Sequence, residues 1–262
     1  MPQLLKHRLT APIFAGVTVL LNICWPLAHG HLRAWITIAG VLTFFAASVS
    51  HSHRNQSQNF TRCLLMLMPL AFLIEAVGVH TSIPFGHYIY GQQLGPCIAN
   101  VPLIIPFAWV MMLYPTYLAS RFVAHKPVVQ VLLGAWLMAS WDLYLDPQMI
   151  REGYWTWFTS SGAPTLVIPL TNFVGWYATS IIFMWLLRSS DSHAHASGSQ
   201  DGGSSMPMTP AVMLAWVWLG SFVANVLPFK PYLDRPAVAV SGLIGMGAVL
   251  VPWSWRLWSK RS

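Results

Sequence analysis

The sequence predicts an all-α integral membrane protein, a bundle of about eight transmembrane helices that forms one domain over residues 1–262. Three observations support this prediction. Hydrophobic residues make up 55% of the 262-residue chain and charged residues only 8%, whereas an ordinary soluble domain is about one quarter charged. The mean hydropathy is +0.55. The apolar residues also fall into runs of about 20 residues, the length that crosses the roughly 30 Å hydrocarbon core of a bilayer.

The apolar runs are expected to be helices, because a backbone in lipid must satisfy its own hydrogen bonds. The fifth and eighth runs are the least regular, so a bundle of seven helices is the alternative. The first run is longer than the core of a signal peptide, and no small-residue cleavage site follows it, so we interpret it as the first span. In chain order, the eight runs are residues 9–28, 32–50, 63–83, 101–120, 128–145, 167–187, 210–229 and 236–255.

Basic side chains near the ends of the runs predict their orientation. With the N-terminus in the cytoplasm, ten of the 14 Lys and Arg residues lie on the cytoplasmic side, as the positive-inside rule favours. Both termini would then be cytoplasmic, in the inner membrane of the cell. The net charge of +7 is spread over these ends, so we expect it to face membrane lipids and not nucleic acid.

Three connections differ in composition. Residues 84–100, PFGHYIYGQQLGPCIAN, are rich in aromatic residues, Gly and Pro, which predicts a structured turn or a short hairpin. Residues 147–166 contain YWTW, which is aromatic enough to lie at the membrane interface. Residues 189–209 are rich in Ser and Gly and predict a disordered cytoplasmic loop.

Three of the seven acidic residues lie within or at the end of apolar runs, where an ionisable side chain needs a partner or a function. They are Glu75, Asp142 and Asp146. No Lys or Arg lies deep in a span, so we expect no internal salt bridge. An unpaired carboxyl group in apolar surroundings tends to stay protonated, and a protonated carboxyl group can serve as an acid catalyst.

Each of these carboxyl groups also has a structural interpretation. Asp146 precedes Pro147, and Asp at the N-cap followed by Pro is a common helix start. Asp142 lies a full turn earlier on the same face, and its alternative role is a buried hydrogen bond to a neighbouring helix. The same alternative applies to Glu75.

Three His-x-His pairs suggest a metal site, but we predict none. The pairs fall in expected loops, and no carboxylate or cysteine accompanies them at ligand spacing. The three cysteines form neither a CxxC motif nor a disulfide framework. The pairs are His29 with His31, His51 with His53, and His193 with His195.

Four stretches in a fixed order show a resemblance to a known family. They read EAVGVHTSIPFGHYIYGQQLGP, NVPLIIPFAWVMM, SWDLYLDPQMIREGYWTW and IPLTNFVGW, and the resemblance runs from about residue 72 to residue 177. Together they resemble the membrane carotenoid biosynthesis family that contains bisanhydrobacterioruberin hydratase and γ-carotene hydratase. The resemblance implies addition of water across the terminal C=C bond of an acyclic carotenoid end group, which gives a tertiary alcohol. It implies a hydro-lyase that needs no cofactor.

The residues agree with this chemistry. Protonating an isolated alkene requires a strong acid held away from water, and the resulting cation requires aromatic faces or a carboxylate nearby. We expect Asp142 to donate the proton, Glu75 to be its partner or the base that activates water, and Asp146 to shape the site. The expected substrate-binding residues are His80, Phe85, His87, Tyr88, Tyr90, Trp109, Trp141, Asn172 and Trp176.

Two other functions remain open at this point. A carotenoid end-group cyclase begins from the same protonated alkene and closes a ring where a hydratase captures water. A proton-coupled transporter would use Glu75 and Asp142 as a relay, although the sequence shows no internal repeat. The expected partners are a carotenoid substrate, membrane lipids and other enzymes of carotenoid biosynthesis.

Overall fold

The computed structural model describes residues 2–195, 206–227 and 235–259. These residues form eight continuous helical segments, and each coincides with one of the eight predicted runs. Six helices are long and apolar enough to cross a membrane, so the predicted all-α membrane fold is confirmed. The helices are α1 (Pro2–Cys24, continued by the 3₁₀ turn η1, Trp25–Leu27), α2 (Gly30–Asn55), α3 (Gln58–Thr81), α4 (Ile105–Val123), α5 (Pro127–Arg151), α6 (Leu170–His195), α7 (Met208–Ala215), the π-helix η2 (Trp216–Gly220), α8 (Ser221–Val226) and α9 (Pro236–Ser259).

Local sequence signals explain several helix ends. The Ser57 side chain caps α3 by accepting a hydrogen bond from the backbone N–H of Phe60 at 3.1 Å. Helix α3 ends at Ser82, whose left-handed backbone (φ 62°) lets its N–H bond the carbonyl of Gly78. Pro127 begins α5, in the first-turn position where its missing N–H costs nothing.

Several helix boundaries differ from the predicted ones, and polar contacts hold two of the extensions. Helix α5 continues past the predicted end at residue 145 and includes Pro147, whose carbonyl accepts a hydrogen bond from Arg235. Helix α6 continues to His195, so the predicted loop of residues 189–209 begins later. Buried Asp191 holds this extension, because it accepts a hydrogen bond from Tyr117 at 2.7 Å and pairs with Arg121. Residues 196–205 of that loop lie outside the described residues.

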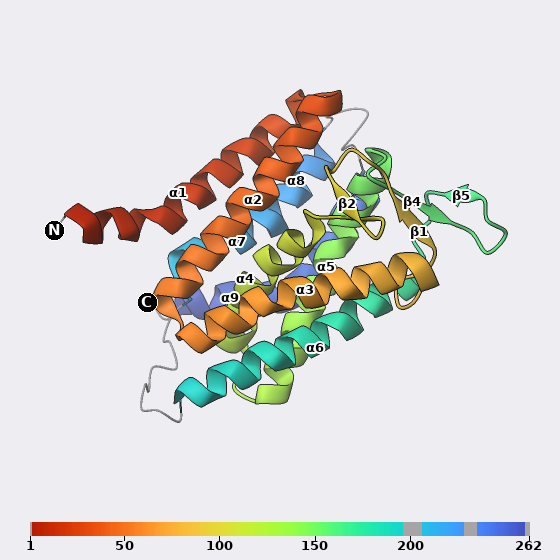
Figure 1. Cartoon of the computed structure of the whole chain (residues 1–262). Coiled ribbons are helices and arrows are strands. Elements are labelled where there is room, and N and C mark those ends of the chain that lie inside the picture. Colours follow the sequence, from red (N-terminus) through yellow and green to blue (C-terminus); the bar gives the residue numbers. More distant parts are fainter. Residues whose placement is uncertain (1, 196–205, 228–234, 260–262) are drawn as a thin grey trace.

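Helix α4 lies at the centre of the bundle. It contacts α2, α3, α5 and α9, and almost all its side chains from Ile105 to Ser120 are buried. A helix that is apolar on every side is expected in such a position. The other helices surround it, with α1 against α2 and with α6 and α9 against α5 (Figure 1).

Short strands close one end of the bundle. The strands are β1 (Tyr88–Tyr90), β2 (Cys97–Ile98), β3 (Val101–Pro102), β4 (Trp155–Phe158) and β5 (Pro164–Thr165). They form an antiparallel sheet of order β1-β4-β5 and a small β2–β3 hairpin. The predicted structured connection at residues 84–100 is thus present, although the hairpin extends to Pro102 and β1 pairs with β4 outside this segment. Most of the YWTW stretch belongs to β4, the central strand of the sheet, and Trp155 and Trp157 are buried; its place at the membrane interface stays a prediction.

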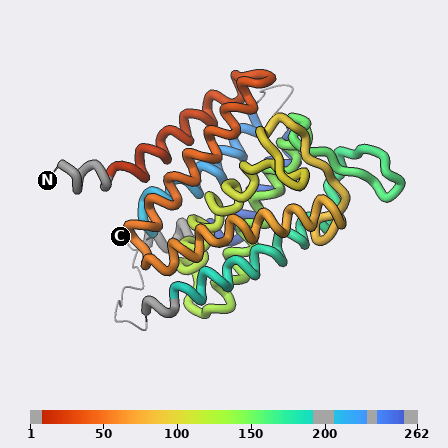
Figure 2. Tube along the Cα trace, viewed as in Figure 1, coloured from red at the N-terminus to blue at the C-terminus, as the bar shows by residue number. Residues whose placement is uncertain are grey.

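Helix α1 begins and helix α9 ends at the end of the bundle away from the strands (Figure 1). Figure 2 shows that the segment before α4 and the segment between α5 and α6 come together at the strand end. That the ends face the cytoplasm stays a prediction.

Candidate active site

The strand pair β1–β4 directs four aromatic side chains toward the helices. Its register places Tyr88 opposite Trp157 and Tyr90 opposite Trp155. Because alternate residues of a strand share one face, the hydroxyl groups of the tyrosines and the indole N–H groups of the tryptophans point the same way. The two tyrosines both donate hydrogen bonds to Glu75, and the two tryptophans both donate to Asp146.

Glu75 on α3 is buried among hydrogen-bond donors. Its Oε2 accepts from the hydroxyl of Tyr88 at 2.6 Å and from that of Tyr90 at 2.8 Å, and its Oε1 accepts from Trp109 Nε1 at 2.8 Å. Burial, and next the charge of Glu75, raise the pKa of the Tyr88 hydroxyl well above its ordinary value, so this hydroxyl stays protonated and donates. Three donors around two oxygens suit a carboxylate, which only accepts hydrogen bonds.

Asp146 on α5 has a similar surrounding. It accepts hydrogen bonds from the indole nitrogens of Trp155 and Trp157, the latter at 2.9 Å to Oδ1, and from Asn172 Nδ2 at 2.8 Å. Its interpretation as an N-cap before Pro147 is wrong, because both residues lie inside α5. The side chain faces the sheet and not the N–H groups of a new helix.

Asp142 differs from the other two carboxyl groups. It lies one turn before Asp146 on α5 and is also buried. Its Oδ2 accepts a hydrogen bond from Asn172 Nδ2 at 2.6 Å, and Asn172 on α6 thereby bridges the two aspartates. Within the described part of the chain, Asn172 is the only hydrogen-bond donor to Asp142, and none of the three carboxyl groups has an ion-pair partner. One oxygen of Asp142 is therefore open to carry a proton.

The three carboxyl groups line a small cavity of about 40 Å³, which we call the acid pocket. A pocket of this size has room for about one water molecule. The rings of Trp109 and Trp176 stack at its wall, with centroids 4.0 Å apart and planes 13° apart. The acid pocket thus combines acidic groups with aromatic faces. Its lining residues are Glu75, Phe85, Tyr88, Tyr90, Ile105, Ala108, Trp109, Asp142, Leu145, Asp146, Trp155, Trp157, Asn172 and Trp176.

Most predicted site residues line the acid pocket, but three do not. Trp141 lies behind Trp176, with ring centroids 5.8 Å apart, and lines a neighbouring cavity. His80 is exposed and bonds the carbonyl of Ala76 on its own helix. It follows Glu75 by five residues, which turns it about 140° away around the helix.

His87 is the third of these residues. It is exposed and stacks on Phe158 at 4.9 Å. It precedes Tyr88 directly, and neighbouring residues in an extended chain face opposite sides. His80 and His87 are thus close in sequence to Glu75 and Tyr88, but neither lines the acid pocket.

The sequence did not identify Trp155 and Trp157 as donors to Asp146, and their stretch was predicted to lie at the membrane interface. A signal for them exists, because Tyr-x-Tyr at residues 88–90 and Trp-x-Trp at residues 155–157 share the spacing of two that puts side chains on one strand face. Which strands pair cannot be read from that spacing alone.

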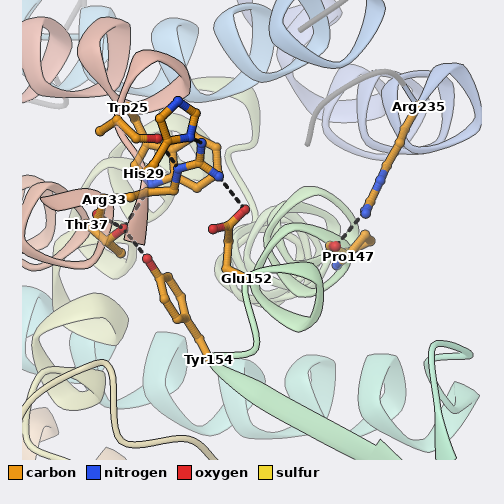
Figure 3. A network of polar contacts seen from close by, with 9 residues as sticks. Trp25, His29, Arg33, Thr37, Pro147, Glu152, Tyr154 and Arg235 are labelled. Atoms are coloured by element: carbon orange, nitrogen blue, oxygen red, sulfur yellow. Dashed lines mark hydrogen bonds and ion pairs between the residues drawn. The ribbon is translucent and has the colours of Figure 1, made fainter. Parts of the chain in front are cut away.

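A buried ion pair fixes the start of β4 (Figure 3). Arg33 Nη1 on α2 donates to Glu152 Oε1 at 2.8 Å, and the guanidinium lies 4.6 Å from the ring centre of Trp25. Thr37 of the same helix bonds the hydroxyl of Tyr154 at 3.3 Å. Glu152 and Tyr154 directly precede the tryptophans of β4, so this network positions the donors to Asp146.

Most members of the His-x-His pairs lie in helices α2 and α6. The loop positions expected for them are wrong for most members, since His31, His51 and His53 lie in α2. Buried His51 instead contacts the hydroxyl of Tyr114 at 2.7 Å. Among the residues that the structure describes, no cluster of three or more His, Cys, Asp or Glu side chains could hold a metal ion.

Replacing Gly78 on α3, even by alanine, is expected to lower the stability of the protein. An added Cβ would lie 2.8 Å from the Phe85 ring and 3.0 Å from the Tyr88 hydroxyl. Gly78→Ala should therefore destabilise the protein by about 1–3 kcal/mol through overpacking, although Ala normally favours a helix over Gly by about 0.5–1 kcal/mol. Thermal unfolding in detergent measures this change. Gly16→Ala in α1 is the matched control, because an added Cβ meets nothing within 4 Å; equal melting temperatures for the two variants would contradict the prediction.

Comparisons with known proteins assign the chain to a family. A sequence model described as "Carotenoid biosynthesis protein" matches residues 34–248, a range that contains every residue lining the acid pocket. The bisanhydrobacterioruberin hydratase of Haloarcula japonica is 25% identical over 173 residues, which are 63% of this chain and 58% of the hydratase. The chain thus matches less than two thirds of the length of this relative. No solved structure matches the chain.

Proposed function

The chain belongs to the family of carotenoid biosynthesis proteins, and from this premise we propose that it is a carotenoid hydratase. It adds water to the terminal C=C bond of an acyclic carotenoid end group and forms a tertiary alcohol. The observation that carries the proposal is the acid pocket, in which two carboxyl groups are surrounded by donors and a third, Asp142, is not. We place the reaction in the cytoplasmic membrane, where a lipid-soluble carotenoid and the enzymes that make it are at hand.

Protonation of the alkene is the first step. The O–H bond of Asp142 breaks, and a C–H bond forms at the less substituted alkene carbon. The positive charge then rests on the tertiary carbon. Asp142 suits this role because, among the residues that the structure describes, Asn172 at 2.6 Å is its only donor, so its second oxygen can hold a proton and direct it at the substrate.

The cation is stabilised by the rest of the acid pocket. Glu75 and Asp146, each held by three donors, supply negative charge in a water-poor environment. The stacked rings of Trp109 and Trp176 present aromatic faces that attract a cation. Fixed hydrogen bonds keep both carboxylates from moving onto the cationic carbon as nucleophiles.

Capture of water completes the reaction. A water oxygen forms a C–O bond with the tertiary carbon, and the water then loses one proton. Asp142, now a carboxylate, takes up that proton and returns to its starting state. The sum is one alkene plus one water giving one alcohol, and no redox step or cofactor is needed.

The alternatives account less well for the same site. A cyclase must fold the end group into a ring inside the acid pocket, and in a pocket of about 40 Å³ a folded end group needs more room than an extended one. A proton-coupled transporter needs a relay that crosses the bundle. Glu75, Asp142 and Asp146 instead surround one pocket beneath the strands.

Expression in a bacterium that accumulates lycopene tests the proposal. We expect a new pigment that is heavier than lycopene by one water molecule and keeps its absorption spectrum, because the terminal alkene is not part of the conjugated chain. Chromatography with mass spectrometry measures it. A product of unchanged mass would show cyclisation, and unchanged pigment in membranes that contain the protein would refute hydration of this substrate.

A further inference from the structure

A second and much larger cavity lies beside the acid pocket. It has a volume of about 720 Å³ and lies between α1 and α2 on one side and α7, η2 and α8 on the other, with α5 contributing Trp141, Leu145 and Met149. We call it the lateral cavity. Leu145 lines both cavities, and Trp141 packs edge-on against Trp176 of the acid pocket. The two spaces are therefore separated by single side chains.

The lateral cavity is accessible from the lipid side of the bundle. Several of its apolar lining residues are exposed, among them Ile23 (52%), Val223 (48%) and Leu227 (42%). They belong to, or directly follow, segments that are long and apolar enough to cross a membrane, so their exposed faces meet hydrocarbon and not water. A lipid-soluble ligand can thus enter without leaving the bilayer.

The walls of the lateral cavity present few free polar groups. Thr18 donates to the carbonyl of Phe14 at 2.9 Å, and the amide of Asn225 donates to the carbonyl of Ser221 at 2.8 Å. The hydroxyl oxygen of Thr37 accepts a hydrogen bond from Trp25 Nε1 at 2.9 Å. These three side chains are satisfied within the protein, so they lose no hydrogen bond when an apolar ligand enters. The other polar side chains of the wall are Asn22, Gln148 and Ser221.

The shape of the lateral cavity suits a long ligand. Its wall extends from Val212 to Leu227, a length of about 22 Å at 1.5 Å per residue. The middle of this wall is the π-helix η2, a rare element that is often found at functional sites. The volume of about 720 Å³ lies within the range of about 300–1,000 Å³ that is typical of ligand pockets.

We propose that the lateral cavity binds the polyene chain of the substrate while the end group reaches past Leu145 into the acid pocket. This inference rests on the proposed function, because it takes the acyclic carotenoid as the ligand. The acid pocket alone is too small for such a molecule. Leu145, which lines both cavities, and the Trp141–Trp176 contact mark the place where the polyene site adjoins the acids.

A binding measurement tests the polyene site without turnover. Purified protein in detergent is titrated with lycopene, and quenching of tryptophan emission reports binding, since Trp25, Trp141 and Trp216 line the lateral cavity. Ala224→Trp places a large ring in the cavity, and we expect at least tenfold weaker binding. Ala178→Trp on the exposed face of α6 lines neither cavity and should bind as wild type. Ala215→Trp fills the same cavity from another position and serves if the first variant fails to fold.

The outcomes separate this inference from the proposed function. Wild-type binding by folded Ala224→Trp and Ala215→Trp would overturn the polyene site, whatever product forms. The same holds if wild-type protein retains phospholipid that lycopene cannot displace, because the occupant is then a lipid chain. Binding that is lost in the filled variants, together with no hydrated product from wild type, would leave the polyene site standing and refute the hydratase. A short acyclic monoterpene with the same end group should still react in Ala224→Trp, because it does not need the lateral cavity.

Discussion

Replacing Asp142 with asparagine is expected to slow hydration of the carotenoid end group by about 100- to 10,000-fold, the usual contribution of a general acid. The amide has nearly the same shape as the carboxyl group, and its oxygen can still accept the hydrogen bond from Asn172. The fold and the polyene site should therefore survive, while the proton is lost. Initial rates of alcohol formation in membranes, normalised to the amount of folded protein, measure the effect.

Two further variants make the assignment of the donor specific. Asp146→Asn keeps the proton donor and removes one negative charge from the acid pocket, so we expect a smaller loss of rate than for Asp142→Asn. Asp142→Glu keeps an acid at a shifted position and should recover part of the activity. Wild-type rates for Asp142→Asn would show that this residue does not donate the proton, and a larger loss for Asp146→Asn would move the role to that residue.

The helices could be predicted from the sequence because one constraint dominates them. A backbone in lipid must form its own hydrogen bonds, so eight apolar runs imply eight helices. The ends were harder to predict, because contacts between distant residues set them. Helix α6 continues to His195 with Asp191 held by Tyr117 and Arg121, and α5 passes through Pro147.

The site could be predicted only in part. Glu75, Asp142 and Asn172 stood out because polar groups within spans need a reason. Their surroundings depend on the pairing of β1 with β4, which joins residues 88–90 to residues 155–157. A sequence shows the alternation within each strand but not the partner of either. The donors Trp155 and Trp157 were missed for that reason.

The pairing of β1 with β4 also explains why the surroundings of Asp142 and Asp146 differ. Asp142 and Asp146 share a helix face, but only Asp146 lies within reach of the indoles of β4. Two of the three donors to Asp146 thus come from a strand that begins three residues after Glu152. Whatever holds Glu152 in place therefore also sets the environment of the acids.

Replacing Arg33 with methionine is expected to destabilise the protein by about 3 kcal/mol, the lower end of the range for breaking a buried ion pair. Arg33 is 1% exposed, and its partner Glu152 is 10% exposed (Figure 3). Removing the guanidinium leaves the carboxylate of Glu152 buried without its ion-pair partner and empties the space beside Trp25. Denaturant or thermal unfolding in detergent measures the change. A double variant, Arg33→Met with Glu152→Met, should recover much of the stability, because no unpaired charge then remains.

The Arg33 variant should also lower the hydration rate of the protein that remains folded, because β4 loses the anchor of its first residues. Arg121→Met is the matched control. It breaks the ion pair with Asp191 at the opposite end of the bundle, so it should reduce stability while leaving the rate per folded molecule unchanged. If Arg33→Met and Arg121→Met have the same rate per folded molecule, the Arg33 network supports the fold alone. A lower rate for Arg33→Met, with lycopene binding retained, assigns the network to positioning Trp155 and Trp157 around Asp146.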